Sequence, residues 1–477
     1  MRHSQTINQK IWSTCFLLVM LILASCAPVV TPEAETPTSP TMMSPTRTPS
    51  ATAIPDDTPT PTPIPGLEIY PDDLAGIVVR FAHPWIGETA QHLEEIAREF
   101  SKTNPWEIQV EVLPHGGETA LVDTLQTYLV AGEMPGLIAA HPYLLSALGG
   151  DINLVDLGEY FDDPDWGFTA DEQADIFPVF LTPFADGDQV WGLPLAPQAI
   201  VLFYNRTWGE ALGFSEPPTD LDAFRAQTCD AAFTNWRDDN PDSDGTGGWM
   251  INLDPTVLAS WYYAFDGVIP GDEIPSFNHE IGQETFNYLW DVKFQGCSWF
   301  ARQPDPYWYF GNRYALLVAA KTEQIPLQAS WMDVVGSEDE WDVVGFPGVT
   351  GESIVVDGPG LLVTAGTAEE QLAAWLFAKH LLEPEVQAVL VRSLFTLPVR
   401  ASAMDLLGDF VAEYPQWAQA AALDNSASAL PVSDAWGVAQ WVLQDAAFRI
   451  LQAESADVPG LIEQLDAMIL DLTGGTP

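Results

Sequence analysis

The chain has 477 residues, 47% of them hydrophobic, so it can bury the cores of roughly two or three domains. Lys and Arg number 17 against 67 Asp and Glu, which gives a formal net charge of −50. Such a charge repels a phosphate backbone, so a nucleic-acid partner is excluded.

The N-terminal 25 residues are typical of a lipoprotein signal peptide. Arg2 and Lys10 precede an apolar run at residues 16–23 that is too short to span a bilayer and fits the core of a secretory signal. Leu23-Ala24-Ser25-Cys26 resembles a bacterial lipobox, in which signal peptidase cuts before a lipidated cysteine. We therefore expect residues 1–25 to be removed and the lipid on Cys26 to anchor the protein outside the cell membrane. Ordinary secretion with an incidental cysteine is the alternative.

The next segment, residues 26–66, is rich in Pro, Thr and Ser, and residues 58–63 repeat a Thr-Pro dipeptide. This composition cannot bury a core and favours extended polyproline II. We expect a tether that links the lipid to a folded body at residues 67–477.

The folded body opens with alternating strands and helices. Residues 77–82 predict a strand, residues 88–102 an amphipathic helix and residues 107–113 a second strand. A second helix follows with Leu121, Leu125 and Leu129 in register. This order is typical of an α/β layer with a parallel sheet.

The most informative stretch is residues 188–205, which is punctuated by Gly and Pro and ends in an apolar run that predicts a buried strand. Its form, Gly192-Leu193-Pro194 and then an apolar strand ending in Tyr204-Asn205, resembles the first hinge crossing of family 1 extracellular solute-binding proteins of ABC importers. Residues 373–387 followed by Leu397-Pro398-Val399-Arg400 resemble that family most strongly. Further similar segments occur in the family's order at residues 93–110, 132–138, 217–224 and 310–316.

The resemblance implies an α/β fold of the periplasmic-binding-protein type II. In this fold two lobes, each a mostly parallel sheet flanked by helices, are joined by a hinge and bind the ligand in the cleft between them. The implied boundaries are about 77–196 and 340–366 for lobe 1, and about 197–339 and 367–477 for lobe 2.

The sequence contains no Gly-x-Ser-x-Gly, His-Glu-x-x-His or Gly-Lys-Ser/Thr motif. We therefore expect no catalytic residue, no cofactor and no metal, although a glycoside hydrolase with two dispersed carboxylates stays open. Residues 240–246 have the oxygen ligands of half a calcium loop, but Ile251 replaces the distal acid, which favours a polar turn.

Two cysteines, Cys229 and Cys297, belong to the folded body. In an extracytoplasmic compartment they are expected to form a disulfide, with two buried free thiols as the alternative.

Sugar sites combine aromatic rings with carboxylates and amides, and the chain has 18 Trp. Core packing is the alternative for each Trp, and a place in a helix's first turn is the alternative for Glu88 and Asp254. By position in the resembled fold, the candidate ligand contacts are His83, Trp85, Glu88, His141, Tyr143, Gln198, Asp254, Trp261, Trp331 and Trp436.

The resemblance therefore implies a monomeric, lipid-anchored, non-enzymatic receptor that closes on a sugar or oligosaccharide and presents it to the transmembrane subunits of an ABC permease. Three alternatives remain: a receptor for another polar solute such as a polyol, glycerol phosphate or peptide, a tethered hydrolase, and a sensory or adhesive lipoprotein. The scarcity of basic residues disfavours an anionic ligand.

Overall fold

The computed structural model describes residues 67, 69–141, 143, 152–186, 189–271, 273–302, 306–364, 366–422, 427–454 and 457–474. The expected signal peptide, Cys26 and the tether lie outside these residues. Within the described segments, no helix combines the length and the apolar character that a membrane crossing requires.

In chain order, the helices are η1 (Pro71–Leu74), α1 (Gly87–Thr103), α2 (Glu118–Ala131), α4 (Gly158–Phe161), α5 (Ala170–Asp175), α6 (Pro178–Leu181), η2 (Thr182–Phe184), α7 (Arg206–Leu212), α8 (Leu221–Arg237), α9 (Pro255–Ala264), α10 (Glu280–Phe294), α11 (Tyr307–Gly311), η3 (Thr322–Gln324), α12 (Ile325–Val335), α13 (Ala368–Leu381), α14 (Pro384–Leu394), η4 (Ala401–Leu406), α15 (Gly408–Glu413), α16 (Pro415–Ala422), α17 (Asp434–Gln452) and α18 (Val458–Leu472). The strands are β1 (Val78–His83), β2 (Gln109–Pro114), β3 (Leu137–Ala140), β4 (Ala185–Asp186), β5 (Gln189–Val190), β6 (Leu193–Pro194), β7 (Gln198–Asn205), β8 (Trp249–Met250), β9 (Ser298–Trp299), β10 (Leu317–Lys321), β11 (Trp341–Val344), β12 (Ile354–Asp357), β13 (Gly360–Val363) and β14 (Ala427–Ala429).

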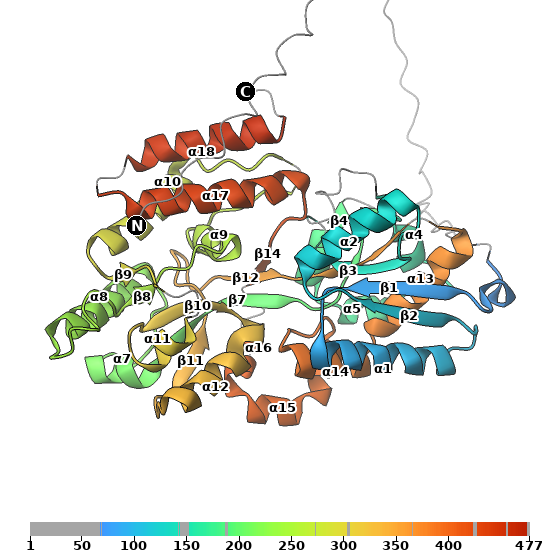
Figure 1. Cartoon of the computed structure of the whole chain (residues 1–477), viewed down its shortest axis with the longest axis horizontal. Helices are drawn as coiled ribbons and strands as arrows, with labels where there is room; N and C mark the ends of the chain where they lie inside the picture. Colours follow the sequence, from blue (N-terminus) through green and yellow to red (C-terminus); the bar gives the residue numbers. More distant parts are fainter. Residues whose placement is uncertain are drawn as a thin grey trace, which may run out of the picture. The chain divides into compact units, whose positions relative to one another are not determined.

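Lobe 1 is built on a sheet with the order β2-β1-β3-β13-β6 (Figure 1). The strands β1, β2 and β3 are parallel, as the sequence predicts, and β13 runs antiparallel to both β3 and β6. Alternate residues of β1 face opposite layers: Val79 and Phe81 pack with α1 and α13, whereas Ala82 packs with α2. The sheet is therefore covered by helices on both faces.

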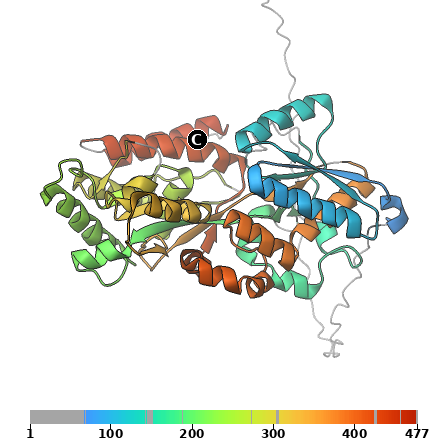
Figure 2. The same ribbon diagram turned by 60° about the horizontal axis from the view of Figure 1, so that its bottom comes forward.

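Lobe 2 has a sheet with the order β14-β12-β7-β10-β8-β9, and β11 also pairs with β7 (Figures 1 and 2). All eight residues of β7 are buried. Ile200, Leu202 and Tyr204 pack with α9, α10, α17 and α18, while Val201 and Phe203 pack with α11, α12 and α16 on the other face. Burial on both faces explains why β7 reads as a continuous apolar run in the sequence.

Three chain segments join the lobes. The first links β6 to β7 through residues 195–197, and the second links β12 to β13 through Gly358 and Pro359. These two lie against each other, because the Leu195 amide donates to the Pro359 carbonyl at 3.2 Å. The third follows α14, and its Leu397 amide donates to the Pro197 carbonyl at 2.7 Å. The predicted hinge crossing is thus one of three neighbouring connections.

The lobe boundaries differ from those implied by the sequence. Strands β11 and β12 pair with β7 and so belong to lobe 2, because the chain crosses to lobe 1 only after Asp357. Helix α13 packs on the sheet of lobe 1, and α14 lies between the two cores. The two-lobed α/β fold is confirmed, but its sheets are mixed rather than mostly parallel, since the crossing strands run antiparallel to their neighbours.

The predicted disulfide is confirmed between Cys229 on α8 and Cys297, which directly precedes β9, with a Cα–Cα distance of 4.3 Å. The predicted polar turn at residues 240–246 also forms. The Asp242 amide donates to the Asn240 side chain, and Ser243 donates to Asp238.

Candidate functional site

Strand ends bring polar side chains to the hinge. Gln198 opens β7 and is paired in register with Asp357, the last residue of β12. Lys321 ends β10 and pairs with Ile200, two residues farther along β7. These three side chains therefore start from neighbouring strands at the edge of the lobe 2 sheet that leads into lobe 1.

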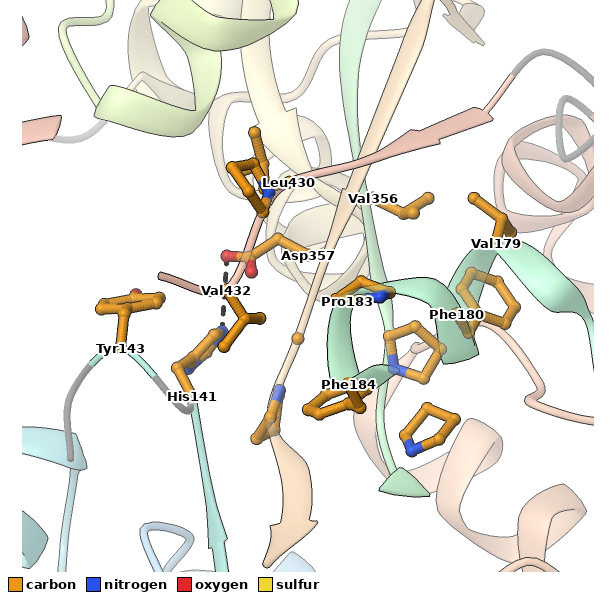
Figure 3. A pocket seen from close by; sticks show the side chains of 15 residues that line it. His141, Tyr143, Val179, Phe180, Pro183, Phe184, Val356, Asp357, Leu430 and Val432 are labelled. Atoms are coloured by element: carbon orange, nitrogen blue, oxygen red, sulfur yellow. Dashed lines mark ion pairs between the residues drawn. The ribbon is translucent and has the colours of Figure 1, made fainter. Parts of the chain in front are cut away.

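His141, which follows β3 of lobe 1, spans from that lobe to the hinge. Its Nδ1 contacts the carboxylate of Glu118 in the first turn of α2, and its Nε2 lies 3.4 Å from Asp357 Oδ2 (Figure 3). The side chains of His141 and Asp357 are each only 12% exposed. The imidazole is therefore held between a carboxylate from helix α2 of lobe 1 and a carboxylate from strand β12 of lobe 2.

A small pocket with a volume of about 30 Å³ lies beside this ion pair and is partly open to solvent. Residues from both lobes line it: His141 and Tyr143 from lobe 1, Asp357 at the hinge, and Leu430 and Val432 from lobe 2 (Figure 3). Its remaining wall is apolar and comes mainly from residues 179–184 and the hinge prolines. The pocket thus combines an aromatic ring and a charged pair with apolar walls.

Lys321 is surrounded by carboxylates. Four of them raise its pKa against the opposing effect of burial, with Asp357 contributing most, then Asp254, Glu323 and Glu118. The lysine makes no ion pair with any residue that the structure describes. Its ammonium group therefore sits within the electrostatic reach of four acids without touching one.

Glu323 and Gln198 connect this group to β7. The Gln198 Nε2 donates to Glu323 Oε2 at 3.2 Å, and Gln198 Oε1 accepts from the Thr322 hydroxyl and the Glu323 amide. The Glu323 side chain is exposed to solvent, yet burial by neighbouring atoms raises its pKa. Glu323 is thus close to the hinge strand β7, although it does not line the described pocket.

The titration behaviour of the site follows from these pairs. Burial lowers the pKa of His141, but Asp357 and Glu118 outweigh it and raise the pKa to about 10. Burial raises the pKa of Asp357, but His141 and Lys321 outweigh it and hold the pKa at about 2. Burial and the nearby acids raise the pKa of the Tyr143 hydroxyl. At neutral pH the site therefore contains an imidazolium, an ammonium and a neutral phenol.

The structure brings four of the ten candidate residues together: His141, Tyr143, Gln198 and Asp254. Asp254 caps α9 by accepting from Thr256, and its charge acts on both Tyr143 and Lys321. The ligand-binding and helix-capping roles considered for Asp254 are therefore compatible.

Two predicted stacking residues lie in the core of lobe 2 instead. Trp261 is fully buried, and its ring contacts Phe224, Trp249 and Phe346. Trp436 is 1% exposed and packs in the same core. Core packing was the alternative to ligand contact for each Trp, and it holds for both. Helices α9 and α17 turn these two indoles into the core of lobe 2, and neither indole lines the pocket.

The other four candidates lie elsewhere on the lobes. His83 is fully buried, and burial, with a smaller effect of His115, lowers its pKa to about 4. Trp85 is half-buried beside it, with ring centroids 5.7 Å apart. Glu88 is exposed in the first turn of α1, and Trp331 is half-buried on α12. None of these four lines the described pocket.

Sequence reasoning missed Glu118, Lys321, Glu323 and Asp357. The sequence held a signal for two of them: Asp357 and Lys321 each end a short, otherwise apolar strand, and Asp357 precedes Gly358-Pro359. Charged residues that end buried strands are candidates for a site at the sheet edge. Among the residues that the structure describes, no cluster of His, Cys, Asp and Glu is arranged to hold a metal ion.

A family model described as bacterial extracellular solute-binding protein matches residues 95–422. A comparison with curated proteins finds no match.

Solved structures of similar fold include MalE, the sugar-binding protein of Xanthomonas citri, with a TM-score of 0.71 and 18% identity over 83% of this chain and 97% of that chain. The cyclic alpha-maltosyl-1,6-maltose binding protein of Arthrobacter globiformis has a TM-score of 0.70 and 16% identity over 83% and 99%. UgpB of Mycobacterium tuberculosis, in complex with glycerophosphocholine, has a TM-score of 0.65 and 15% identity over 83% and 98%. At these identities the similarity shows a shared fold.

The match to the family model spans more than half of the chain, and the similar structures share its fold. The chain therefore belongs to the family of bacterial extracellular solute-binding proteins.

Proposed function

We propose that the protein is the substrate-binding component of an ABC importer and binds a sugar or oligosaccharide between its lobes. The observation that carries this proposal is the composition of a group of charged residues that we call the interlobe cluster. It contains four carboxylates and two cations: Glu118, Asp254, Glu323 and Asp357 with His141 and Lys321. Carboxylates accept hydrogen bonds from hydroxyl groups, and a lysine donates to them. A solute with many hydroxyls satisfies both kinds of group, and Tyr143 offers a ring for its apolar face.

The similar structures support this proposal, since two of the three are named for binding sugars. UgpB, whose structure contains a glycerol phosphodiester, favours a second candidate, a receptor for another polar solute. The cluster argues against a phosphate, because its acids outnumber its cations and would repel an anion in a low-dielectric cleft.

Binding is proposed to close the hinge. The ion pair between His141 and Asp357 already joins lobe 1 to the end of β12, the strand of lobe 2 after which the chain crosses to lobe 1. Backbone hydrogen bonds hold the neighbouring hinge segments together. A solute that contacts both lobes binds the closed state more strongly and shifts the population toward it. No bond of the solute is broken in this cycle.

The cellular setting is part of the proposal. Family membership indicates an extracytoplasmic protein. We infer in addition that a lipid on Cys26 anchors it, that residues 26–66 act as a tether, and that the folded body acts as a monomer. The proposed partners are the transmembrane subunits of an ABC permease, which receive the solute.

A thermal-shift screen of the purified protein against sugars, polyols, peptides and phosphates tests this function. A solute at a hundred times its dissociation constant stabilises the folded state by about 2.7 kcal/mol. We expect a neutral sugar to raise the melting temperature and to be recovered intact. Consumption of the sugar would instead favour the hydrolase, and stabilisation by phosphates alone would favour the second candidate.

A further inference from the structure

A second pocket lies on lobe 2, away from the hinge. It has a volume of about 640 Å³, which is within the range of ligand pockets and far larger than the pocket at the hinge. Its walls come from the C-terminal ends of α10 and α17, which pack side by side (Figure 1), and from Phe300 after β9. We call it the α10–α17 pocket.

Helix α17 separates the two pockets. It begins just after Leu430 and Val432, which line the pocket at the hinge, and its last residues line the α10–α17 pocket. The helix has 19 residues, so its two ends are roughly 25 Å apart. The proposed import cycle therefore leaves the α10–α17 pocket without a role.

Two stacked aromatic rings form one wall of this pocket. Trp290 and Phe294 lie one turn apart on α10, with ring centroids 4.8 Å apart and an angle of 18° between the ring planes. The Trp290 Nε1 donates to the Ala453 carbonyl at 3.1 Å, which holds the indole against the end of α17. Phe294 is 64% exposed, so most of its ring is open to solvent. The pair thus forms a preformed aromatic platform at the surface.

The aromatic surface continues from the pocket along α17. Phe300, which lines the pocket, contacts Phe448 with ring centroids 6.0 Å apart. Trp441 lies two turns before Phe448 on the same face of α17, and both rings are exposed. A row of aromatic rings therefore runs from α10 over Phe300 to the middle of α17.

The charged groups beside these rings balance one another. Lys293 and Glu454 line the pocket with opposite charges, and Gln452 adds an amide. On α17, Arg449 forms an ion pair with Asp445 at 2.8 Å. This balance offers no attraction to a polyanion, and the net charge of −50 on each chain opposes a second copy or an anionic membrane at this surface. It suits a neutral ligand whose hydroxyl groups both donate and accept hydrogen bonds.

We propose that the α10–α17 pocket and its aromatic row are a second binding site, which takes a neutral glycan chain. Aromatic rings stack on the apolar faces of sugar rings, and the hydroxyls at the edges of the same sugars bond to the polar side chains. A row of rings matches a chain of several sugars better than it matches a single sugar. The site is built from residues other than those at the hinge, so the inference does not depend on the proposed function.

Affinity electrophoresis of the purified protein in native gels tests this site. Each gel contains one neutral polysaccharide: glycogen, mixed-linkage β-glucan, arabinoxylan or galactomannan. A further gel contains dextran sulfate, a polyanion. We expect at least one neutral polysaccharide to slow the protein in proportion to its concentration, and dextran sulfate to leave the mobility unchanged.

Matched variants assign the retention to the aromatic row. Phe294→Ala and Trp441→Ala each remove an exposed ring and should weaken retention about fivefold or more without changing the melting temperature. Trp236→Ala is the control, because Trp236 is 63% exposed but lies on α8, outside the pocket, and its loss should leave retention unchanged. Saturation with the solute found by the thermal-shift screen should not release the protein from the glycan.

The outcomes separate this site from the cleft. Unchanged mobility in every neutral polysaccharide overturns the inference and leaves the proposed function intact. Retention that survives in both Phe294→Ala and Trp441→Ala, or that the solute abolishes, also overturns it. A wild type that sediments as a dimer, with Phe294→Ala as a monomer, would show that a second copy covers the rings and overturn it as well. Retention in the absence of any stabilising solute would support the inference while the proposed function fails.

Discussion

His141 joins the two lobes at the hinge. It follows a strand of lobe 1 and pairs with Asp357 at the end of a strand of lobe 2. Glu118 on α2, Tyr143 beside it and Lys321 with Glu323 on the facing lobe are the other ionisable groups around this pair. One imidazolium thus links the position of the lobes to the protonation of the site.

The first prediction concerns pH. The pKa of His141 is raised from 6.5 to about 10, so its stabilisation is complete below 6.5 and is lost as the pH rises toward 10. The pKa of Asp357 is lowered from 3.8 to about 2, so its stabilisation is complete above 3.8 and is lost as the pH falls toward 2. The difference in unfolding free energy between the wild type and His141→Gln should therefore be largest between pH 3.8 and 6.5.

Urea unfolding of both proteins at about pH 5, 7 and 9 measures this difference. A difference that is the same at all three values would show that the imidazole is not held in its charged form by the two carboxylates.

The second prediction separates core tryptophans from cleft residues. Trp261→Ala removes a fully buried ring and should lower the free energy of unfolding by about 3–5 kcal/mol without weakening solute binding by the folded protein. Trp236 is 63% exposed on α8, so Trp236→Ala should change stability by less than about 0.5 kcal/mol. Denaturant unfolding and titration calorimetry give the two quantities. If Trp261→Ala instead loses affinity for the solute and keeps its stability, Trp261 contacts the solute and is not a core residue.

At the scale of elements, the hinge depends on the close approach of its first two segments. A Cβ atom added at Gly358 would lie 2.7 Å from the Ala196 carbonyl oxygen and 2.8 Å from the Pro197 Cα. Both are backbone atoms, so one crossing must move away from the other.

The third prediction follows from this contact. Gly358→Ala should lower the unfolding free energy by about 1–3 kcal/mol and reduce the ligand-induced change in the radius of gyration seen by small-angle scattering. Gly408→Ala is the matched control, because an added Cβ at the start of α15 meets no atom within 4 Å. Equal behaviour of the two variants would show that the hinge tolerates a wider separation of its crossings.

The fourth prediction concerns the disulfide, which joins α8 to β9 and does not line the pocket. It closes a loop with a sequence separation of 68 residues, so Cys229→Ser with Cys297→Ser should cost about 4 kcal/mol of stability. Solute affinity, measured by calorimetry below the lowered melting temperature, should not change. A weaker affinity would mean that the bridge shapes the site as well as the lobe.

For the whole molecule, the predictable features were those that follow a local pattern. Strand β7 could be predicted from the unbroken apolar run at residues 199–204, because burial on both faces removes polar alternation. The lobe 1 elements followed from hydrophobic periodicity, and the disulfide followed from counting cysteines.

Features that depend on contacts between distant parts of the chain could not be predicted from local sequence patterns. The assignment of β11 and β12 to lobe 2 depends on their register with β7, more than 130 residues earlier in the chain. The direction of an indole is likewise set by helix packing, so Trp261 and Trp436 looked identical in sequence to cleft residues. The acids around Lys321 come from α2, η3, β12 and the start of α9, and only the fold brings them together.

The central claim is that a hydroxylated solute binds intact at the interlobe charge cluster, and one calorimetric comparison tests it most directly. The sugar selected by the thermal-shift screen is titrated into the wild type and into Lys321→Met, and the solute is recovered for mass analysis. We predict one binding site per chain, recovery of unchanged sugar, and an affinity at least about tenfold lower in the variant. Undiminished binding to Lys321→Met, or a sugar that is cleaved during the titration, would contradict the account.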